Sequence, residues 1–170
     1  MKHTFSFAIV ILLFSLNTIA QPLKYTVPSE YSFSTPGEHE SYQTSIIECV
    51  NWLEGTPLDS DFDKREKAVE FLNDWIDANP NVEVELNKGI IIFTEKNPVL
   101  LEAFKGGWAR LVVKDSSRST DRLGCNLAGL ICAMNLYQTR GRKKDKEMEK
   151  LLKIMKKNEL SKWVSQQLAL

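Results

Sequence analysis

Residues 123–137, LGCNLAGLICAMNLY, constrain the fold most, because only Asn126 and Asn135 have polar side chains in this stretch. It falls short of the roughly 20 apolar residues that cross a bilayer. Large apolar side chains share one helical face of it. Small residues form a second face beside them: Gly124, Cys125, Ala128, Gly129, Cys132 and Ala133. We therefore predict a buried central helix whose small face lets another helix approach closely.

Gly106 and Gly107 interrupt the apolar stripe of a second predicted helix, which starts at Asn97-Pro98 and reaches Val112. A glycine inside a helix costs ~1 kcal/mol relative to alanine, so the pair needs a structural reason. We expect both glycines to cross the small face of residues 123–137. The alternative is a hinge or a bend that contacts a ligand.

Other segments have helical periodicity and recognisable ends. A capping box, Thr35-Pro36-Gly37-Glu38, starts a helix that ends near Gly55. Further helices are expected over residues 62–78, 142–157 and 161–168. Between them, VEVEL (82–86) alternates apolar and acidic residues, and a turn at 87–89 precedes the β-branched run 90–93, a pattern typical of a hairpin. We predict a mainly α, single-domain helical bundle of five or six helices with one small β-hairpin.

The first twenty residues have the pattern of a secretory signal peptide: a basic start, an apolar run and small residues before Ala20. The alternative is a membrane anchor, but the apolar run is too short to span a bilayer. We expect cleavage after Ala20 and export to the periplasm or beyond. The mature chain would then have an extended N-terminal arm (21–34), a helical domain (35–170) and no transmembrane segment.

Three cysteines follow the expected signal: Cys49, Cys125 and Cys132. The last two are seven residues apart, roughly 10 Å along one helix, which is too far for a disulfide. Cys49 could pair with either. The alternative is three buried thiols that pack as small apolar side chains.

The charges are unevenly distributed. Residues 21–104 have 6 basic and 16 acidic residues, and residues 105–170 have 15 basic and 6 acidic ones. Such asymmetry can provide a basic face for an anionic partner. We favour the alternative that the two parts neutralise each other once packed, because the whole chain has no net charge.

Catalytic and metal-binding candidates are few. His39 is the only histidine after the expected signal, so an enzyme, for example a hydrolase, would have to use His39 or Cys49. Asp59, Asp61, Asp63 and Glu70 occupy positions 1, 3, 5 and 12 of a calcium loop. However, Lys64 stands where that loop needs glycine. The alternative is that these carboxylates cap a helix and complement its dipole. No other cofactor is expected.

Binding functions fit the sequence better than catalysis. We expect a non-enzymatic binding or interaction protein that uses surfaces near Trp52 or Trp163, with an envelope protein or an anionic surface as partner. An alternative is an anion-binding module that uses the basic helix 142–157, including Lys143, Lys144 and Lys150, to hold lipid head groups, acidic glycans or nucleic acid. A solvated face of a bundle helix would have the same composition.

Three segments, FKGGW (104–108), GCNLAG (124–129) and LLKIMKKNELSKW (151–163), resemble those of small secreted proteins from Bacteroidota-type bacteria. The resemblance covers most of the expected mature chain. It implies export in a Gram-negative cell, and it implies no activity and no site residue.

Overall fold

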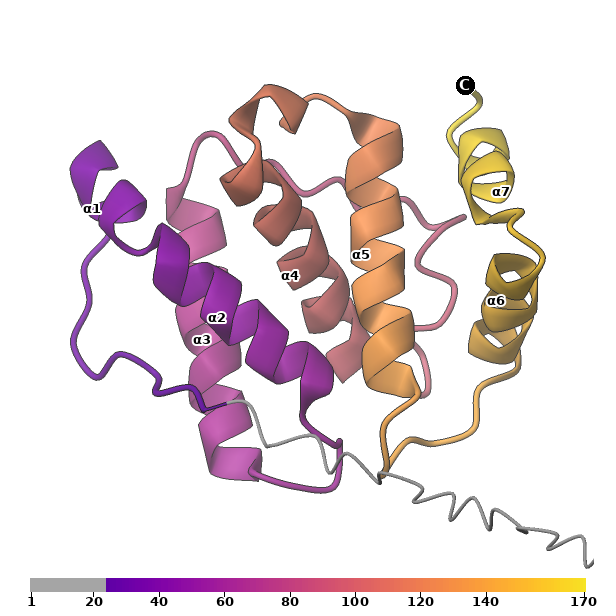
Figure 1. The fold of residues 1–170 in the computed structure, drawn as a ribbon, viewed down its shortest axis with the longest axis horizontal. Helices are drawn as coiled ribbons and strands as arrows, with labels where there is room; N and C mark the ends of the chain where they lie inside the picture. Colours follow the sequence, from indigo (N-terminus) through magenta and orange to yellow (C-terminus); the bar gives the residue numbers. More distant parts are fainter. Residues whose placement is uncertain (1–23) are drawn as a thin grey trace, which may run out of the picture.

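The computed structural model describes residues 24–170, which form seven α-helices and one 3-10 turn (Figure 1). The helices are α1 (Pro36–Ser41), α2 (Gln43–Gly55), α3 (Phe62–Ala78), α4 (Val99–Lys114), α5 (Arg122–Tyr137), α6 (Lys146–Lys156) and α7 (Leu160–Gln167); the 3-10 turn η1 is Ser116–Arg118. The expected signal peptide and residues 21–23 of the arm lie outside the described residues. The mainly α class is confirmed.

The capping box at the start of α1 forms as expected, since the Thr35 amide donates to Glu38 Oε2 at 2.9 Å. The helix does not continue to Gly55 in one piece. It breaks at Tyr42, whose ring packs edge-on against Phe33 and Phe71. The break accounts for one helix more than the predicted maximum of six.

α4 and α5 lie side by side in the centre of the fold, as the small residues predicted (Figure 1). A Cβ atom added to Gly107 would lie 2.4 Å from the Ala128 carbonyl oxygen, and one on Gly129 would lie 2.7 Å from the Phe104 ring. Gly106 differs from the prediction, because it faces Val50 of α2 and Leu72 of α3. α5 is also less enclosed than expected, because the Ile131 side chain is 42% exposed.

The predicted hairpin was wrong, because residues 24–170 contain no strand. Residues 82–87 are extended, and the alternation places Val82 inward, but no second strand pairs with them. Instead Asn87 accepts hydrogen bonds from the Ile90 and Ile91 amides. The resulting turns bury Ile90 and Phe93 against the helices. An isolated pair of strands is only marginally stable in water. Residues 90–93 therefore form turns that pack against the helices and do not form a second strand.

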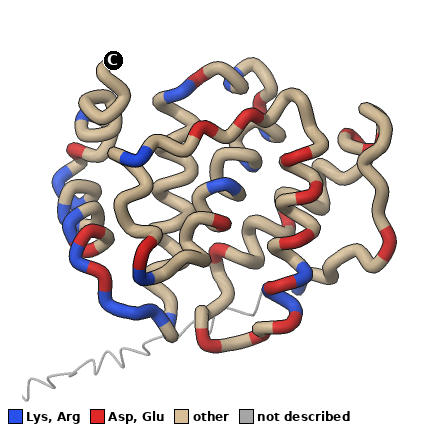
Figure 2. Tube along the Cα trace, turned by 180° about the vertical axis from the view of Figure 1, so that it is seen from behind, with Lys and Arg blue, Asp and Glu red and all other residues tan. Residues whose placement is uncertain are grey.

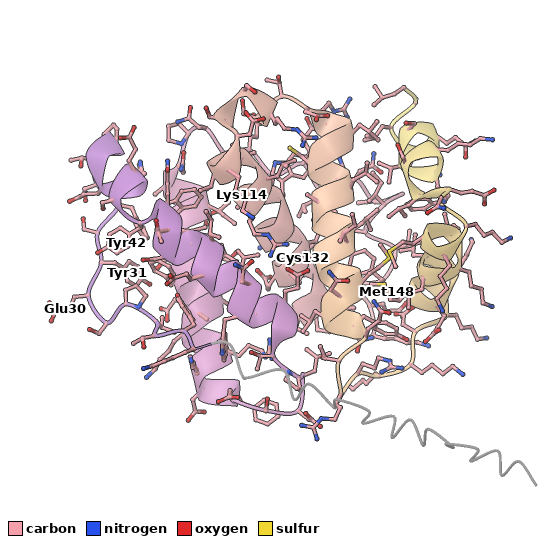
Figure 3. All side chains as sticks on the ribbon, viewed as in Figure 1. Glu30, Tyr31, Tyr42, Lys114, Cys132 and Met148 are labelled. Atoms are coloured by element: carbon pink, nitrogen blue, oxygen red, sulfur yellow. The ribbon has the colours of Figure 1, made fainter. Side chains whose placement is uncertain are left out.

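The arm from residue 24 to residue 34 is part of the packed structure. Tyr25 is buried against Trp52, with ring centroids 6.1 Å apart. Tyr31 stacks on Phe33, and its hydroxyl donates to Asp74 Oδ2 at 2.8 Å. Figure 3 shows Tyr31 and Tyr42 on this side of the molecule, beside α2.

α6 and α7 form the opposite side of the molecule, packed on α5 (Figure 1). The segment before α6 is fixed to the start of α4 by reciprocal hydrogen bonds between the Asn97 side chain and the Lys143 backbone, at 2.8 and 2.9 Å. Within residues 24–170, no helix is long and apolar enough to cross a membrane.

Candidate anion-binding surface

α6 presents a row of lysines to solvent. Lys146, Lys150, Lys153 and Lys157 follow one another at intervals of four, three and four residues, so their side chains lie on one helical face. The row extends about 16 Å at 1.5 Å per residue. All four are exposed. We call these residues the lysine row.

The local sequence fixes the direction of the lysine row. Met148, Leu151 and Leu152 are buried against the rest of the bundle, on the face of α6 opposite the lysines. Asp145 caps the helix by accepting hydrogen bonds from the Glu147 and Met148 amides. The lysines therefore point away from the core. Lys143 and Lys144 are also exposed, but they precede the helix, which starts four residues later than predicted.

Ion pairs elsewhere in the fold join the acidic and basic parts of the chain. They connect Arg110 with Glu54 at 2.5 Å, Arg122 with Glu85 at 2.8 Å and Arg140 with Asp59 at 3.9 Å. In the lysine row, only Lys150 has a partner among the described residues, Glu147 on the same helix at 3.8 Å. The expected mutual neutralisation thus involves arginines and leaves the lysine row out. Figure 2 shows blue concentrated on α6 and the segment before it.

The lysine row carries an electrostatic cost inside this molecule. Like charges three or four residues apart on a helix destabilise it by about 0.2–0.5 kcal/mol per pair. The helix dipole favours only the lysines in the last turn. A lysine ammonium is a point charge with three rotatable donors and no fixed fork. Such a row suits many weakly ordered anionic groups better than one rigid carboxylate or phosphate.

Trp163, one of the two tryptophans predicted to bind a ligand, lies next to this surface. It is partly exposed on α7 and borders a hollow of about 240 Å³ with Ile154 and Lys162. The hollow is shallow and small for a ligand pocket. Trp163 therefore adds an amphipathic ring to the edge of a basic surface.

Trp52, the other predicted binding residue, is only 4% exposed. The Lys64 ammonium lies 4.4 Å from its ring centroid, and Tyr25 covers it from the arm. Arg65 is buried next to them and donates hydrogen bonds to the Thr56 and Pro57 carbonyl oxygens, both at 2.8 Å. The surroundings of Trp52 thus resemble a packed core. A binding role for Trp52 stays a prediction.

The structure does not join His39 and Cys49 into a nucleophile and base pair. Cys49 Sγ donates to the Ala68 carbonyl at 3.3 Å, and burial raises the pKa of this thiol to about 12. His39 is buried, and its ring stacks on Phe33. Cys125 and Cys132 are free and buried too, and burial raises both of their pKa values. All three thiols are thus protonated at neutral pH, which disfavours nucleophilic chemistry.

The four calcium candidates lie apart along the loop and α3. Asp61 is the N-cap residue of α3, and Asp59 faces Arg140. Glu70 is two helical turns beyond Asp63, so it cannot fold back as the twelfth ligand of a loop. In the described part of the chain, no group of three or more potential metal ligands is gathered. Calcium binding stays a prediction without geometric support.

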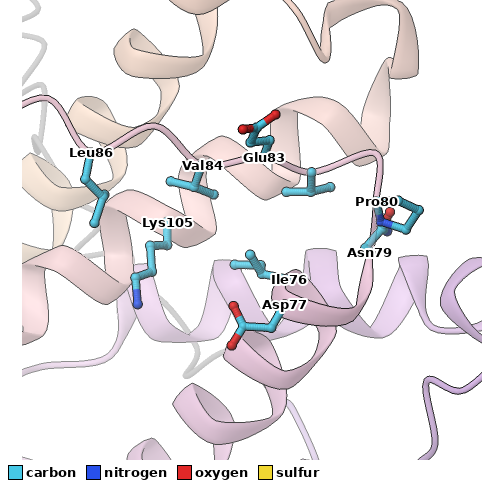
Figure 4. Close-up of a pocket in the computed structure, with 9 residues that line it drawn as sticks. Ile76, Asp77, Asn79, Pro80, Glu83, Val84, Leu86 and Lys105 are labelled. Atoms are coloured by element: carbon cyan, nitrogen blue, oxygen red, sulfur yellow. The ribbon is translucent and has the colours of Figure 1, made fainter.

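A second concave feature lies away from the lysine row. Figure 4 shows a groove of about 480 Å³ between the end of α3 and the extended segment 82–86. Val84 and Leu86 point into it opposite Ile76, and Asp77 and Lys105 stand at its edges. Its one cation, Lys105, is already bound by Glu102 at 3.2 Å. The groove therefore offers little to an anion.

Lys143, Lys144 and Lys150 were predicted as binding residues of the basic helix, and Lys146, Lys153 and Lys157 of the same predicted helix are exposed as well. The signal was present in the spacing of the lysines, which puts them on the helical face opposite the buried Met148, Leu151 and Leu152. In comparisons with known proteins, no family, no curated protein and no solved structure matches this chain.

Proposed function

We propose that this protein is a non-enzymatic, exported binding protein that associates with an anionic lipid surface through the lysine row of α6. The observation that carries the proposal is that the row faces solvent and that, among the described residues, only Lys150 in it has an ion-pair partner. Lys143 and Lys144 extend the surface, and Trp163 stands at its border. Tryptophan favours membrane interfaces, where one side of the ring is apolar and the other is wet.

The magnitude of the attraction sets the mode of binding. Each lysine near an anionic membrane contributes about 1 kcal/mol. Four to six lysines then provide about 4–6 kcal/mol, which corresponds to dissociation constants from about 1 mM down to tens of micromolar. Met148, Leu151 and Leu152 of α6 are buried, and Ile154 and Met155 are only partly exposed. The helix therefore has little apolar surface to insert into the bilayer. Binding is therefore peripheral, reversible and sensitive to salt.

Vesicle binding tests the proposal. Co-sedimentation with phosphatidylcholine vesicles is compared with and without phosphatidylglycerol, at about 0.01 M and about 0.15 M salt, where the Debye lengths are about 30 and 8 Å. We expect binding only to the vesicles that contain phosphatidylglycerol, and weaker binding at the higher salt. Equal binding to both kinds of vesicle, or none to either, would contradict the proposal.

Paired variants locate the surface. Lys150→Gln with Lys153→Gln removes two charges from the row, and the affinity should fall about 30-fold at about 1 kcal/mol per lysine. Lys88→Gln with Lys114→Gln removes two exposed lysines elsewhere and should leave binding nearly unchanged. Retention on heparin or duplex DNA without vesicle binding would assign the row to a glycan or a nucleic acid and overturn the lipid proposal.

A further inference from the structure

α3 carries an acidic counterpart of the lysine row. Asp63, Glu66, Glu70, Asp74 and Asp77 follow at intervals of three, four, four and three residues, and all five are exposed. They lie on the face of α3 opposite its buried Phe71 and Trp75. We call these residues the acidic row. It extends about 21 Å along the helix.

The acidic row has no ion-pair partner among the residues that the structure describes. Asp74 accepts a hydrogen bond from the Tyr31 hydroxyl, which is neutral. Lys64 and Lys67 are on the same helix, but Lys64 is bound to the Tyr25 carbonyl and lies over Trp52. Lys67 is exposed on the same face, four residues after Asp63 and three before Glu70, and it has no ion-pair partner among the described residues. The face thus has five carboxylates and a single ammonium, so its net charge is strongly negative.

The two rows lie on opposite sides of one molecule. In Figure 1, α3 lies behind α2 on the side away from α6, and Figure 2 shows blue on the side of α6 and much of the red on the other side. Each row faces away from the core, so they cannot meet within one chain. Their spacing along a helix is the same, three or four residues per charge, and their signs are opposite.

We propose that the lysine row of one copy docks on the acidic row of a second copy. Because the two rows differ and lie on opposite sides, the contact is head-to-tail, and it leaves a free row at each end. The proposal shares the lysine row with the lipid surface but does not depend on lipid binding. An anionic membrane would compete with the second copy for the same lysines.

The contact is expected to be weak. Exposed ion pairs contribute little individually, and association loses translational and rotational freedom. It should therefore be detected only in concentrated protein at low ionic strength. A Debye length of about 30 Å at 0.01 M salt leaves the attraction intact, and about 8 Å at 0.15 M weakens it.

Light scattering of the purified protein over a range of concentrations is the experiment. At about 0.01 M salt, we expect the average mass to rise continuously with concentration, and the rise to disappear at high salt. A constant monomer mass would overturn the proposal. A mass that stops at a dimer would overturn the head-to-tail arrangement.

Charge-reversal variants identify the two rows. Lys150→Glu with Lys153→Glu, or Glu66→Lys with Glu70→Lys, should each abolish the rise in mass, and an equimolar mixture of the two double variants should restore it. The matched controls are Lys88→Glu with Lys114→Glu and Glu40→Lys with Glu95→Lys, which change the net charge equally at exposed sites outside the rows. If the mixture of controls associates as strongly as the mixture of row variants, net charge alone explains the effect and the proposal fails.

The outcome can be separated from that of the proposed function. The variant with Glu66→Lys and Glu70→Lys should lose self-association but still sediment with phosphatidylglycerol vesicles. For the wild-type protein, self-association without vesicle binding would refute the lipid proposal alone. Vesicle binding by the wild-type protein without any self-association would refute the docking of two copies alone.

Discussion

Gly107 of α4 lies directly against the backbone of Ala128 of α5, so closely that a Cβ atom on Gly107 would stand 2.4 Å from the Ala128 carbonyl oxygen. That oxygen belongs to the main chain of a helix and cannot rotate away as a side chain can. The contact joins the two central helices of the bundle. α5 in turn supports α6 and α7, so the direction of the lysine row depends on this packing.

Replacing Gly107 by alanine should therefore destabilise the protein, although alanine is the better helix former. Overpacking a tight core typically costs about 1–3 kcal/mol, and we expect a loss near the upper end of that range in urea unfolding. The matched control is Gly37→Ala in α1, where an added Cβ meets nothing within 4 Å. It should be neutral or slightly stabilising. Equal effects of the two substitutions would contradict the close approach of α4 and α5.

Arg65 should be essential for the connection between α2 and α3. Its buried guanidinium donates to the Thr56 and Pro57 carbonyls, which follow the end of α2. Arg65→Met would leave these carbonyls without their donor, and hydrogen bonds to a charged group are worth about 1.5–3 kcal/mol. A free energy of unfolding lower by about that amount is expected in urea titrations. Arg65→Lys should restore only part of it, because a single ammonium cannot reproduce the fork. An unchanged midpoint for Arg65→Met would show that the bonds contribute nothing.

Asp121 should contribute a pH-dependent share of stability. Hydrogen bonds from the Gly124 amide and then from the Arg118 side chain lower the pKa of this N-cap carboxyl of α5. A lowered pKa in the folded state means that the contribution is complete above the unfolded pKa of about 3.9 and disappears as the pH falls through the folded value. Asp121→Ala should cost about 1 kcal/mol at neutral pH, and its difference from the wild type should shrink in acid. A difference that is constant from neutral pH to strongly acidic pH would contradict this assignment.

The three cysteines should be unreactive in the folded protein. Burial raises the pKa of Cys49 to about 12 and that of Cys125 to about 11, and Cys132 is enclosed where α5 meets α4 (Figure 3). A chromogenic disulfide reagent at mildly alkaline pH should react slowly with the native protein and with all three thiols after denaturation. Rapid reaction of Cys49 in the native state would support an enzyme that uses this thiol, and rapid reaction of Cys125 or Cys132 would contradict their burial.

The sequence predicted the central packing because glycine and alanine along one helix face allow the backbone of another helix to approach closely. Gly107 and Gly129 lie at this close approach, as predicted. Gly106 contacts Val50 and Leu72 instead, because adjacent residues of a helix point about 100° apart. The alternation of Val82, Val84 and Leu86 predicted a strand that pairs in a hairpin, but only Val82 is buried, Leu86 is 44% exposed, and no strand pairs with this segment. Pairing depends on tertiary contacts that periodicity does not contain. The burial of Trp52 could not be predicted from the sequence either, because Lys64 and the arm, which cover its ring, are distant from it in sequence.

The direct test of the lysine row is a residue-by-residue map of the surface that meets an anionic bilayer. Amide chemical shifts are recorded while bicelles with or without phosphatidylglycerol are added to the protein. The account predicts shifts at Lys143, Lys144 and along α6 from Lys146 to Lys157, only with the anionic bicelles, while the amides of α3 stay in place. Shifts centred on α3 or on the groove at Val84, or the same shifts with neutral bicelles, would contradict it.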